Sequence, residues 1–189
     1  MFYMKSRFHQ LILVATAAML PFLGVAHAQV DTSKSTVTAT SKQMNVPVDG
    51  TFRKFTAQLV FDPARPTAGS AQLSIDTASY DLGDQSYNRQ VRGKDWFDSA
   101  QFPNATFVSS SIAPASGNQF KVSGKLTIKG KSENVTVPVS VTQQGAVQTF
   151  DGTLPIKRSQ FDIGTGEWKD TSVVADEVLI RFHIVEAKK

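Results

Sequence analysis

The 189-residue chain contains no cysteine and only three histidines. Without cysteine the chain can form no disulfide, thiolate nucleophile, cysteine-ligated zinc site or lipid-modified N-terminal cysteine. His9 and His27 lie within the first 28 residues, so His183 stands alone in the remainder. One histidine is too few for most metal sites and most Ser-His catalytic arrangements. The sequence therefore indicates a fold held by its apolar core alone.

The N-terminal segment has the pattern of a secretory signal. Lys5 and Arg7 precede an uncharged apolar stretch over residues 11–25, and Ala26-His27-Ala28 follows. Positive, apolar and A-x-A regions in this order predict a signal peptide, residues 1–28, cleaved after Ala28. The stretch is shorter than the ~20 residues of a spanning helix, which makes an uncleaved anchor the weaker alternative. We therefore expect an exported, periplasmic protein comprising residues 29–189.

The small net charge gives little reason to expect a polyanionic partner such as a nucleic acid. Twenty basic and 16 acidic residues give a net charge of +4, and losing Lys5 and Arg7 with the signal leaves +2. The remaining lysines are dispersed: Lys121, Lys125 and Lys129 recur along a strand-like segment instead of forming a basic run. Such spacing is typical of the solvated face of a strand. We expect no nucleic-acid partner.

Alternation of apolar and polar residues dominates the chain after residue 29 and predicts antiparallel strands with one wet face. Turn residues separate several segments, at Val48-Asp49-Gly50, Asp62-Pro63, Ser116-Gly117-Asn118 and Gln144-Gly145. The predicted strands cover residues 35–43, 55–61, 72–76, 104–113, 120–128, 135–142, 146–157 and 178–184. The fold class predicted is all-β: a single antiparallel barrel of about eight strands.

One segment, residues 84–97, lacks this alternation and predicts a short helical segment. Asp84 suits a helix N-cap, and Gly93 would stop or kink the helix. No low-complexity linker or internal repeat divides residues 29–189, so a single domain is expected. The helical segment would then lie against the barrel.

Candidate catalytic and metal-binding groups are few. Asp95 with Asp98, or Asp162 with Glu167, could be read as acid–base pairs, but nothing in their neighbourhood suggests the desolvation that would separate their pKa values. His183 alternates with apolar neighbours and should face solvent. We predict no catalytic residue, no metal site and no enzyme activity.

The aromatic residues are more informative than the candidate catalytic groups: the chain contains 13 Phe, two Trp and three Tyr. Several fall at strand ends or near the predicted helix. They would form either ordinary core or the wall of an apolar cavity, because about eight strands enclose just enough space for side chains or for one ligand. The pattern by itself leaves both interpretations open.

Several motifs, taken in order, resemble the YceI-like family of exported, lipocalin-like polyisoprenoid-binding proteins. They include Gly50-Thr51-Phe52, Trp96-Phe97-Asp98, Phe161-Asp162-Ile163-Gly164 and the run Gly124-Lys125-Leu126-Thr127-Ile128-Lys129-Gly130. The resemblance implies an eight-stranded barrel covered by a helix, holding a long isoprenoid lipid such as ubiquinone. It supplies no catalytic residues. Many members have a Lys-His pair where this chain has Lys42-Gln43, so head-group contacts through that histidine do not carry over.

The expected ligand is thus an isoprenoid lipid or quinone, with no other cofactor. The predicted ligand-binding residues are Phe52, Phe55, Trp96, Phe97, Phe107, Ile128, Phe161, Trp168 and Ile180. A transient membrane-surface contact and a second copy of the chain are further candidate partners. The alternatives are a solid-core module serving a membrane redox partner, or a lipid-modifying enzyme using Asp98, Asp162 or Arg158.

Two further positions carry expectations that a structure can test. Strand parity places Gly124 on the inner face, where a larger side chain should displace lipid. Arg158 should be structural, because a charge entering the barrel wall needs a partner. Asp162 and Asp98 are the predicted partners of Arg158.

Overall fold

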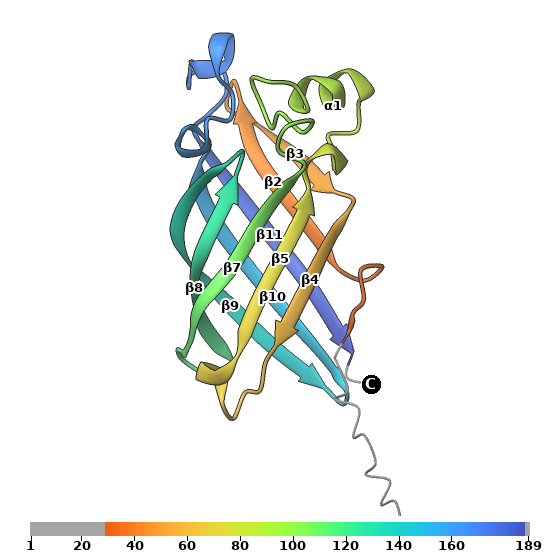
Figure 1. Cartoon of the computed structure of the whole chain (residues 1–189), viewed down its shortest axis with the longest axis vertical. Coiled ribbons are helices and arrows are strands. Elements are labelled where there is room, and N and C mark those ends of the chain that lie inside the picture. The colour runs from red at the N-terminus through yellow and green to blue at the C-terminus, as the bar shows by residue number, and fades with distance from the viewer. Residues whose placement is uncertain (1–28, 188–189) are drawn as a thin grey trace, which may run out of the picture.

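The computed structural model describes residues 29–187, a barrel of antiparallel strands with one α-helix at its upper end (Figure 1). The predicted signal peptide lies outside the described residues. The helix is α1 (Gln85–Val91), and short 3-10 turns cover Pro66–Ala68, Thr77–Ser79, Arg158–Phe161 and Gly166–Lys169. The strands are β1 (Gln29–Val30), β2 (Thr36–Gln43), β3 (Val46–Phe52), β4 (Phe55–Val60), β5 (Ser70–Asp76), β6 (Tyr80–Asp81), β7 (Asn104–Pro114), β8 (Gln119–Ile128), β9 (Lys131–Gln144), β10 (Val147–Lys157) and β11 (Glu177–Ala187).

The strands form one curled sheet in the order β4-β5-β7-β8-β9-β10-β11-β2-β3-β6, with β1 paired to β11. Every pairing is antiparallel. The predicted fold class, an all-β antiparallel barrel with a short helix, is therefore confirmed. The strand number differs from the predicted eight, because β1 and β6 add two-residue pieces and the sequence reading missed β3.

The missed strand β3 has a clear physical reason. Val48-Asp49-Gly50 was predicted as a turn, but Asp49 lies on the outer face of β3, where it accepts a hydrogen bond from Thr40. Gly50 lies under the Tyr80 ring, and a Cβ there would approach that ring to 2.3 Å. The Asp-Gly pair therefore reflects close packing within a strand, and the prediction of a turn is wrong.

Helix α1 begins where the sequence predicts. The Asp84 carboxylate accepts hydrogen bonds from the backbone N–H groups of Ser86 and Tyr87, at 2.7 and 3.2 Å. These bonds satisfy two amides that have no partner inside the helix. The helix ends at Val91, two residues before Gly93. Within residues 29–187 no helix is long and apolar enough to cross a membrane.

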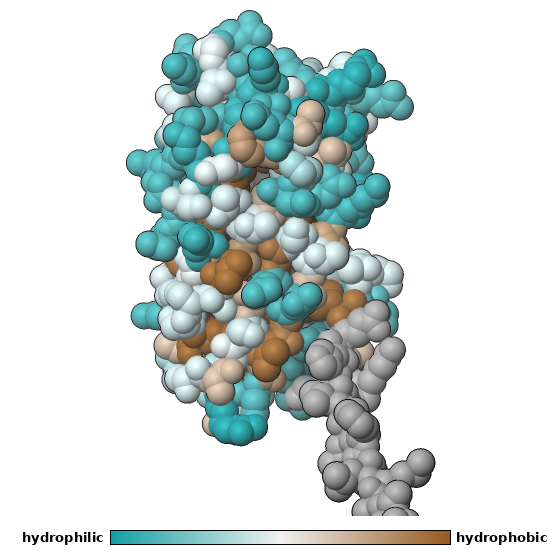
Figure 2. Space-filling view, in the orientation of Figure 1, coloured by the Kyte–Doolittle hydropathy of each residue, from teal (hydrophilic) through white to brown (hydrophobic). Residues whose placement is uncertain are grey.

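The inner face of the barrel is mostly apolar, with the buried polar pair Gln148 and Glu186 as an exception, whereas the outer surface is mixed. Strand β8 shows the alternation, since Phe120, Val122, Leu126 and Ile128 are buried and the lysines between them are exposed. Figure 2 shows a mainly hydrophilic surface around the α1 end, with hydrophobic side chains visible over the strands below it. The core thus lies inside the barrel.

Gly124 faces inward as predicted, but it does not border empty space. A Cβ at this position would lie 2.6 Å from the Phe107 ring and 2.5 Å from the Val108 carbonyl oxygen. The Phe107 ring already fills the space that a larger residue would need. The expectation that a bulky residue at Gly124 would displace lipid without harming the barrel is therefore wrong.

We predict that Gly124→Ala destabilises the barrel by about 1–3 kcal/mol, because it overpacks the wall against Phe107 and a backbone carbonyl. Chemical denaturation followed by circular dichroism measures the change. Lys125→Ala, on the outer face of the same strand, is the control and should change stability by less than about 0.5 kcal/mol, because the Lys125 side chain is exposed. Equal stability of the two variants would contradict the packing described here.

Candidate ligand cavity

Two cavities lie one above the other inside the barrel. The upper cavity, beneath α1, has a volume of about 390 Å³, and the lower cavity about 120 Å³. Along β11, Val178 lines the upper cavity and Phe182 the lower, while Ile180 between them lines both. Strand β10 has the same order, with Ile156 above and Leu154 below. The cavities therefore meet at the level of Ile180.

The lower cavity is almost wholly apolar. Its only polar lining side chains are Ser70 and Thr106. Its aromatic wall includes Phe61, whose ring packs edge to face against Phe120 and Phe150, with centroids 4.9 and 5.6 Å apart. A cavity of this chemistry excludes polar ligands, because each unpaired buried polar group costs about 1–3 kcal/mol.

The upper cavity combines an aromatic wall with a few polar groups. Phe52, Tyr80 and Phe97 form one cluster, with ring centroids 4.6 to 6.0 Å apart. The Tyr80 hydroxyl donates to the Ala39 carbonyl at 3.1 Å, and burial raises the pKa of Tyr80. Within residues 29–187 the buried indole Nε1 of Trp96 has no hydrogen-bond partner. Trp96 thus carries an unused donor beside a wall that is mostly apolar.

Both tryptophans of the chain belong to this cavity. Trp96 and Trp168 both line it, and their ring centroids are 5.6 Å apart. Intrinsic tryptophan fluorescence therefore reports on the upper cavity alone.

Arg158 fixes the wall of the upper cavity opposite α1. It is 3% exposed, and all five N–H donors of its guanidinium are used. They bond to the backbone carbonyl oxygens of Ala175, Ile163, Gly164, Trp168 and Val174, at 2.7 to 3.1 Å. Burial lowers the pKa of Arg158, yet a guanidinium stays protonated.

The partners predicted for Arg158 are therefore wrong. Asp162 instead forms an ion pair with Lys131 at 3.1 Å, and Asp98 makes no ion pair with Arg158 within residues 29–187. Backbone carbonyls replace a carboxylate because residues 163–175 wrap around the guanidinium. In this way one side chain determines the path of the loop that covers the cavity.

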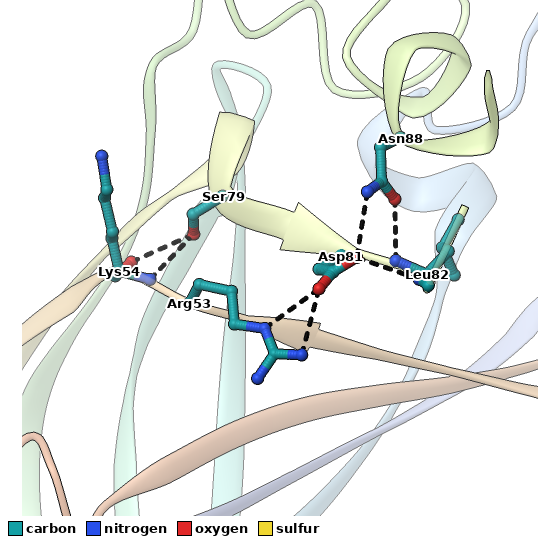
Figure 3. Close-up of polar contacts among 7 residues, drawn as sticks. Arg53, Lys54, Ser79, Asp81, Leu82 and Asn88 are labelled. Atoms are coloured by element: carbon teal, nitrogen blue, oxygen red, sulfur yellow. Dashed lines mark hydrogen bonds and ion pairs between the residues drawn. The ribbon is translucent and has the colours of Figure 1, made fainter. Parts of the chain in front are cut away.

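Helix α1 is held over the cavity by a second polar cluster (Figure 3). Asp81 accepts hydrogen bonds from the Asn88 amide at 2.9 Å and from Arg53, which also forms an ion pair with it at 3.0 Å. Asn88 in turn accepts the backbone N–H of Leu82 at 2.8 Å. The hydrogen bond from Asn88, with those from Gly83 and Arg53, lowers the pKa of Asp81 to about 2. The carboxylate therefore stays ionised far below neutral pH, and α1 stays anchored.

The predicted ligand-binding residues separate into two groups. Those that line the upper cavity are Phe52, Trp96, Phe97, Ile128, Trp168 and Ile180. Phe107 lines the lower cavity, which Ile180 also reaches. Phe55 and Phe161 line neither: Phe161 is 1% exposed within the core, and Phe55 packs partly buried against that core. Contact of any of these residues with a ligand stays a prediction.

The sequence reading missed other lining residues. Phe120 and Phe150 could have been found, because each lies on the inward parity of its strand. Tyr80 could not, since the two-residue strand β6 gives no periodic signal.

Elsewhere the described residues offer no reactive arrangement. Within residues 29–187 no three His, Asp or Glu side chains converge as a metal site would require. His183 lies on the outer face, as predicted, and its Nδ1 is 2.7 Å from an Asp151 carboxylate oxygen. What the interior can do chemically is enclose a long, mostly apolar molecule.

A lipocalin-like barrel with an internal apolar cavity is the class of protein that this fold and site define. The chain belongs to the YceI-like domain family, which matches residues 29–186. Protein YceI of Escherichia coli is 31% identical over 96 residues, 51% of this chain and 50% of that protein. Protein YceI of Salmonella arizonae is 30% identical over 128 residues, 67% of this chain and 64% of that protein. The chain thus matches about half to just under two thirds of these curated relatives' length.

Solved structures share the barrel. The crystal structure of BcnA from Burkholderia cenocepacia is 68% identical, with a TM-score of 0.82, covering 83% of this chain and 99% of that one. A polyisoprenoid-binding domain from Saccharophagus degradans, implicated in plant cell wall breakdown, is 19% identical, with a TM-score of 0.71, covering 87% of this chain and 99% of that one. The second likeness shows the fold alone.

We predict that Arg158→Met lowers the free energy of unfolding by about 3–5 kcal/mol, because it leaves five buried carbonyl oxygens without their shared donor. Urea denaturation measures the loss. Arg158→Lys should restore little of the lost free energy of unfolding, because an ammonium group cannot reproduce the planar fork of N–H donors. The control is Arg92→Met at an exposed position, with a change below about 0.5 kcal/mol. A fully stable Arg158→Met protein that no longer binds lipid would instead make Arg158 a head-group contact.

Proposed function

We propose that this protein is an exported, periplasmic carrier that holds one long isoprenoid lipid, such as a polyprenyl quinone, inside the barrel. The observation that carries the proposal is the pair of cavities that meet at Ile180. Together they offer an apolar path along the barrel, which suits a narrow, linear ligand. Membership of the YceI-like family and the polyisoprenoid-binding domain of similar fold support the ligand class.

The physical chemistry of the cavities suits reversible carriage. The upper volume of about 390 Å³ lies in the usual range for small-molecule sites. Each CH₂ group that leaves water gains roughly 0.8 kcal/mol, so a polyprenyl tail has ample driving force to leave water. A bilayer offers nearly the same gain. The net preference between protein and membrane is therefore small, which permits both loading and release.

The distribution of polar groups gives the ligand a direction. The head group lies in the upper cavity, where Gln43 and Gln90 line the wall and Trp96 Nε1 can donate to a carbonyl or hydroxyl oxygen. Arg158 adds a fixed positive charge but no free donor, since its five N–H groups are occupied. The prenyl tail points down into the apolar lower cavity. The far end of the tail contacts Phe61, Phe120 and Phe150.

The alternatives fit less well. A solid-core module would not need the upper cavity. An enzyme using Asp98 or Asp162 would need those carboxylates in the cavity wall, and neither lines it. Arg158 does line the upper cavity, but backbone carbonyl oxygens occupy all five of its N–H donors.

Mass spectrometry of organic extracts tests the proposal. Protein purified from the cell envelope of its host should release an isoprenoid lipid at close to one molecule per barrel. Stripped protein should take up a long-chain quinone with quenching of tryptophan fluorescence. Preparations that yield no lipid and show no uptake of quinone would refute the carrier function.

We predict that Ala39→Leu shortens the ligand that the barrel accepts. Ala39 is the cross-strand neighbour of Ile180 and lines the upper cavity. A larger side chain there narrows the junction between the cavities. Affinity for a decaprenyl quinone should fall about tenfold or more, equivalent to ~1.4 kcal/mol, while a quinone with two isoprene units should lose less than about threefold.

Thr38→Leu, on the outer face of the same strand, is the matched control and should leave both affinities unchanged. Fluorescence titration of the wild type and both variants measures the six affinities. Parallel losses for the long and the short quinone in Ala39→Leu would show that the lower cavity does not receive the tail.

A further inference from the structure

A small apolar patch protrudes at the mouth of the upper cavity. Met44 is 74% exposed and Val46 is 63% exposed, both in the turn region between β2 and β3, and Val173 is 38% exposed in the neighbouring loop. The Met44 N–H donates to the Val173 carbonyl at 2.8 Å, so the hairpin and the loop are joined. These three residues are the rim patch.

The rim patch continues the lining of the cavity. Val46 has the same strand parity as Val48, which lines the upper cavity, and it lies beyond Val48 toward the tip of the hairpin. Tyr87 of α1 also lines the cavity and is 55% exposed. In Figure 1 the β2–β3 turn and α1 stand at the same end of the barrel. An apolar path therefore leads from the cavity out to the surface.

Local structure does not explain why a large apolar residue occupies the hairpin tip. Met44 and Asn45 have φ angles of 50° and 65°. This left-handed region suits Asn and Gly in two-residue hairpin turns and is unfavourable for a long side chain such as Met. The Met44 side chain is exposed, so it gains nothing from core packing. Its apolar surface is available to something outside the chain.

Charges of both signs surround the mouth. Exposed Lys42, Arg92 and Lys169 form no ion pair within residues 29–187. Exposed carboxylates such as Asp84 and Glu167 lie at the same end and carry negative charge. The charges therefore select no partner by their sign, and the exposed apolar tip is the feature that suits a lipid interface.

We propose that the rim patch inserts into a lipid bilayer and seats the cavity mouth against the membrane. The inference rests on the proposed carrier function, because a lipid ligand must leave and enter a bilayer. Docking in this orientation lets the prenyl chain slide between membrane and barrel without crossing water. Three side chains are too few for a stable interface with a second copy, which needs about 800 Å² from each partner.

Vesicle sedimentation with a matched pair of variants tests the proposal. The rim variant is Met44→Asn, Val46→Thr and Val173→Thr, which keeps the turn and strand preferences. The control is Val60→Thr, Val108→Thr and Val147→Thr. Val60 is 63% exposed, as Val46 is, but it is the last residue of β4, which ends at the opposite end of the barrel from α1 (Figure 1). The vesicles contain phosphatidylcholine, alone or with one quarter phosphatidylglycerol.

The wild type and the control should bind the vesicles of each composition within twofold of each other, and the rim variant at least tenfold more weakly. Quinone transfer from these vesicles should slow to the same extent, whereas quinone uptake from cyclodextrin solution should not change. Equal vesicle binding by the rim variant and the wild type overturns the docking surface, as does a wild type that binds no vesicles. A wild-type dimer that the rim variant converts to monomer also overturns it, in favour of a second copy.

A different result would refute the carrier function independently of the membrane contact. A wild type that takes up no quinone from cyclodextrin contradicts the proposed function, whatever the outcome of sedimentation.

Discussion

The upper half of the barrel depends on the hydrogen bonds that the guanidinium of Arg158 donates. Its five N–H groups bind five carbonyl oxygens of residues 163–175, so the loop over the cavity is shaped by internal bonds instead of by packing into the space beneath it. A loop held in this way can leave a cavity of about 390 Å³ below it. The backbone of Gly164 and Thr165 extends the same network by donating to the Asp95 carbonyl, which joins this loop to the segment after α1.

A cavity of this size has a thermodynamic consequence for binding. Protein interiors are normally close-packed, and unfilled apolar volume reduces stability because the lining atoms lose dispersion contacts. A ligand that fills the space restores those contacts and stabilises the folded state by mass action. The polar cluster of Asp81, Asn88 and Arg53 keeps α1 in place at the same time. The fold thus keeps its upper end rigid while its interior stays available.

Period-2 alternation was sufficient to predict the barrel, and Asp84 to predict the start of α1, because both signals are local. The missed strand β3 and the Arg158 partners have a common cause: they depend on neighbours distant in sequence. Gly50 looks like a turn residue until the Tyr80 ring is placed over it, and no sequence pattern shows that backbone carbonyls surround Arg158. For the cavity, strand parity identified Ile128 and Ile180 as inward-facing. It could not show that Phe161 would be wholly buried while Phe107 reaches the lower space.

In the proposed carrier, one prenyl chain runs through both cavities past Ile180, with its head group uppermost. A crystal structure with a long-chain quinone brominated at the end of its tail tests this most directly. The anomalous signal of bromine should lie beside Phe61, Phe120 and Phe150, and the quinone ring should lie within hydrogen-bond distance of Trp96 Nε1. Bromine in the upper cavity, or a tail outside the barrel, would contradict the account.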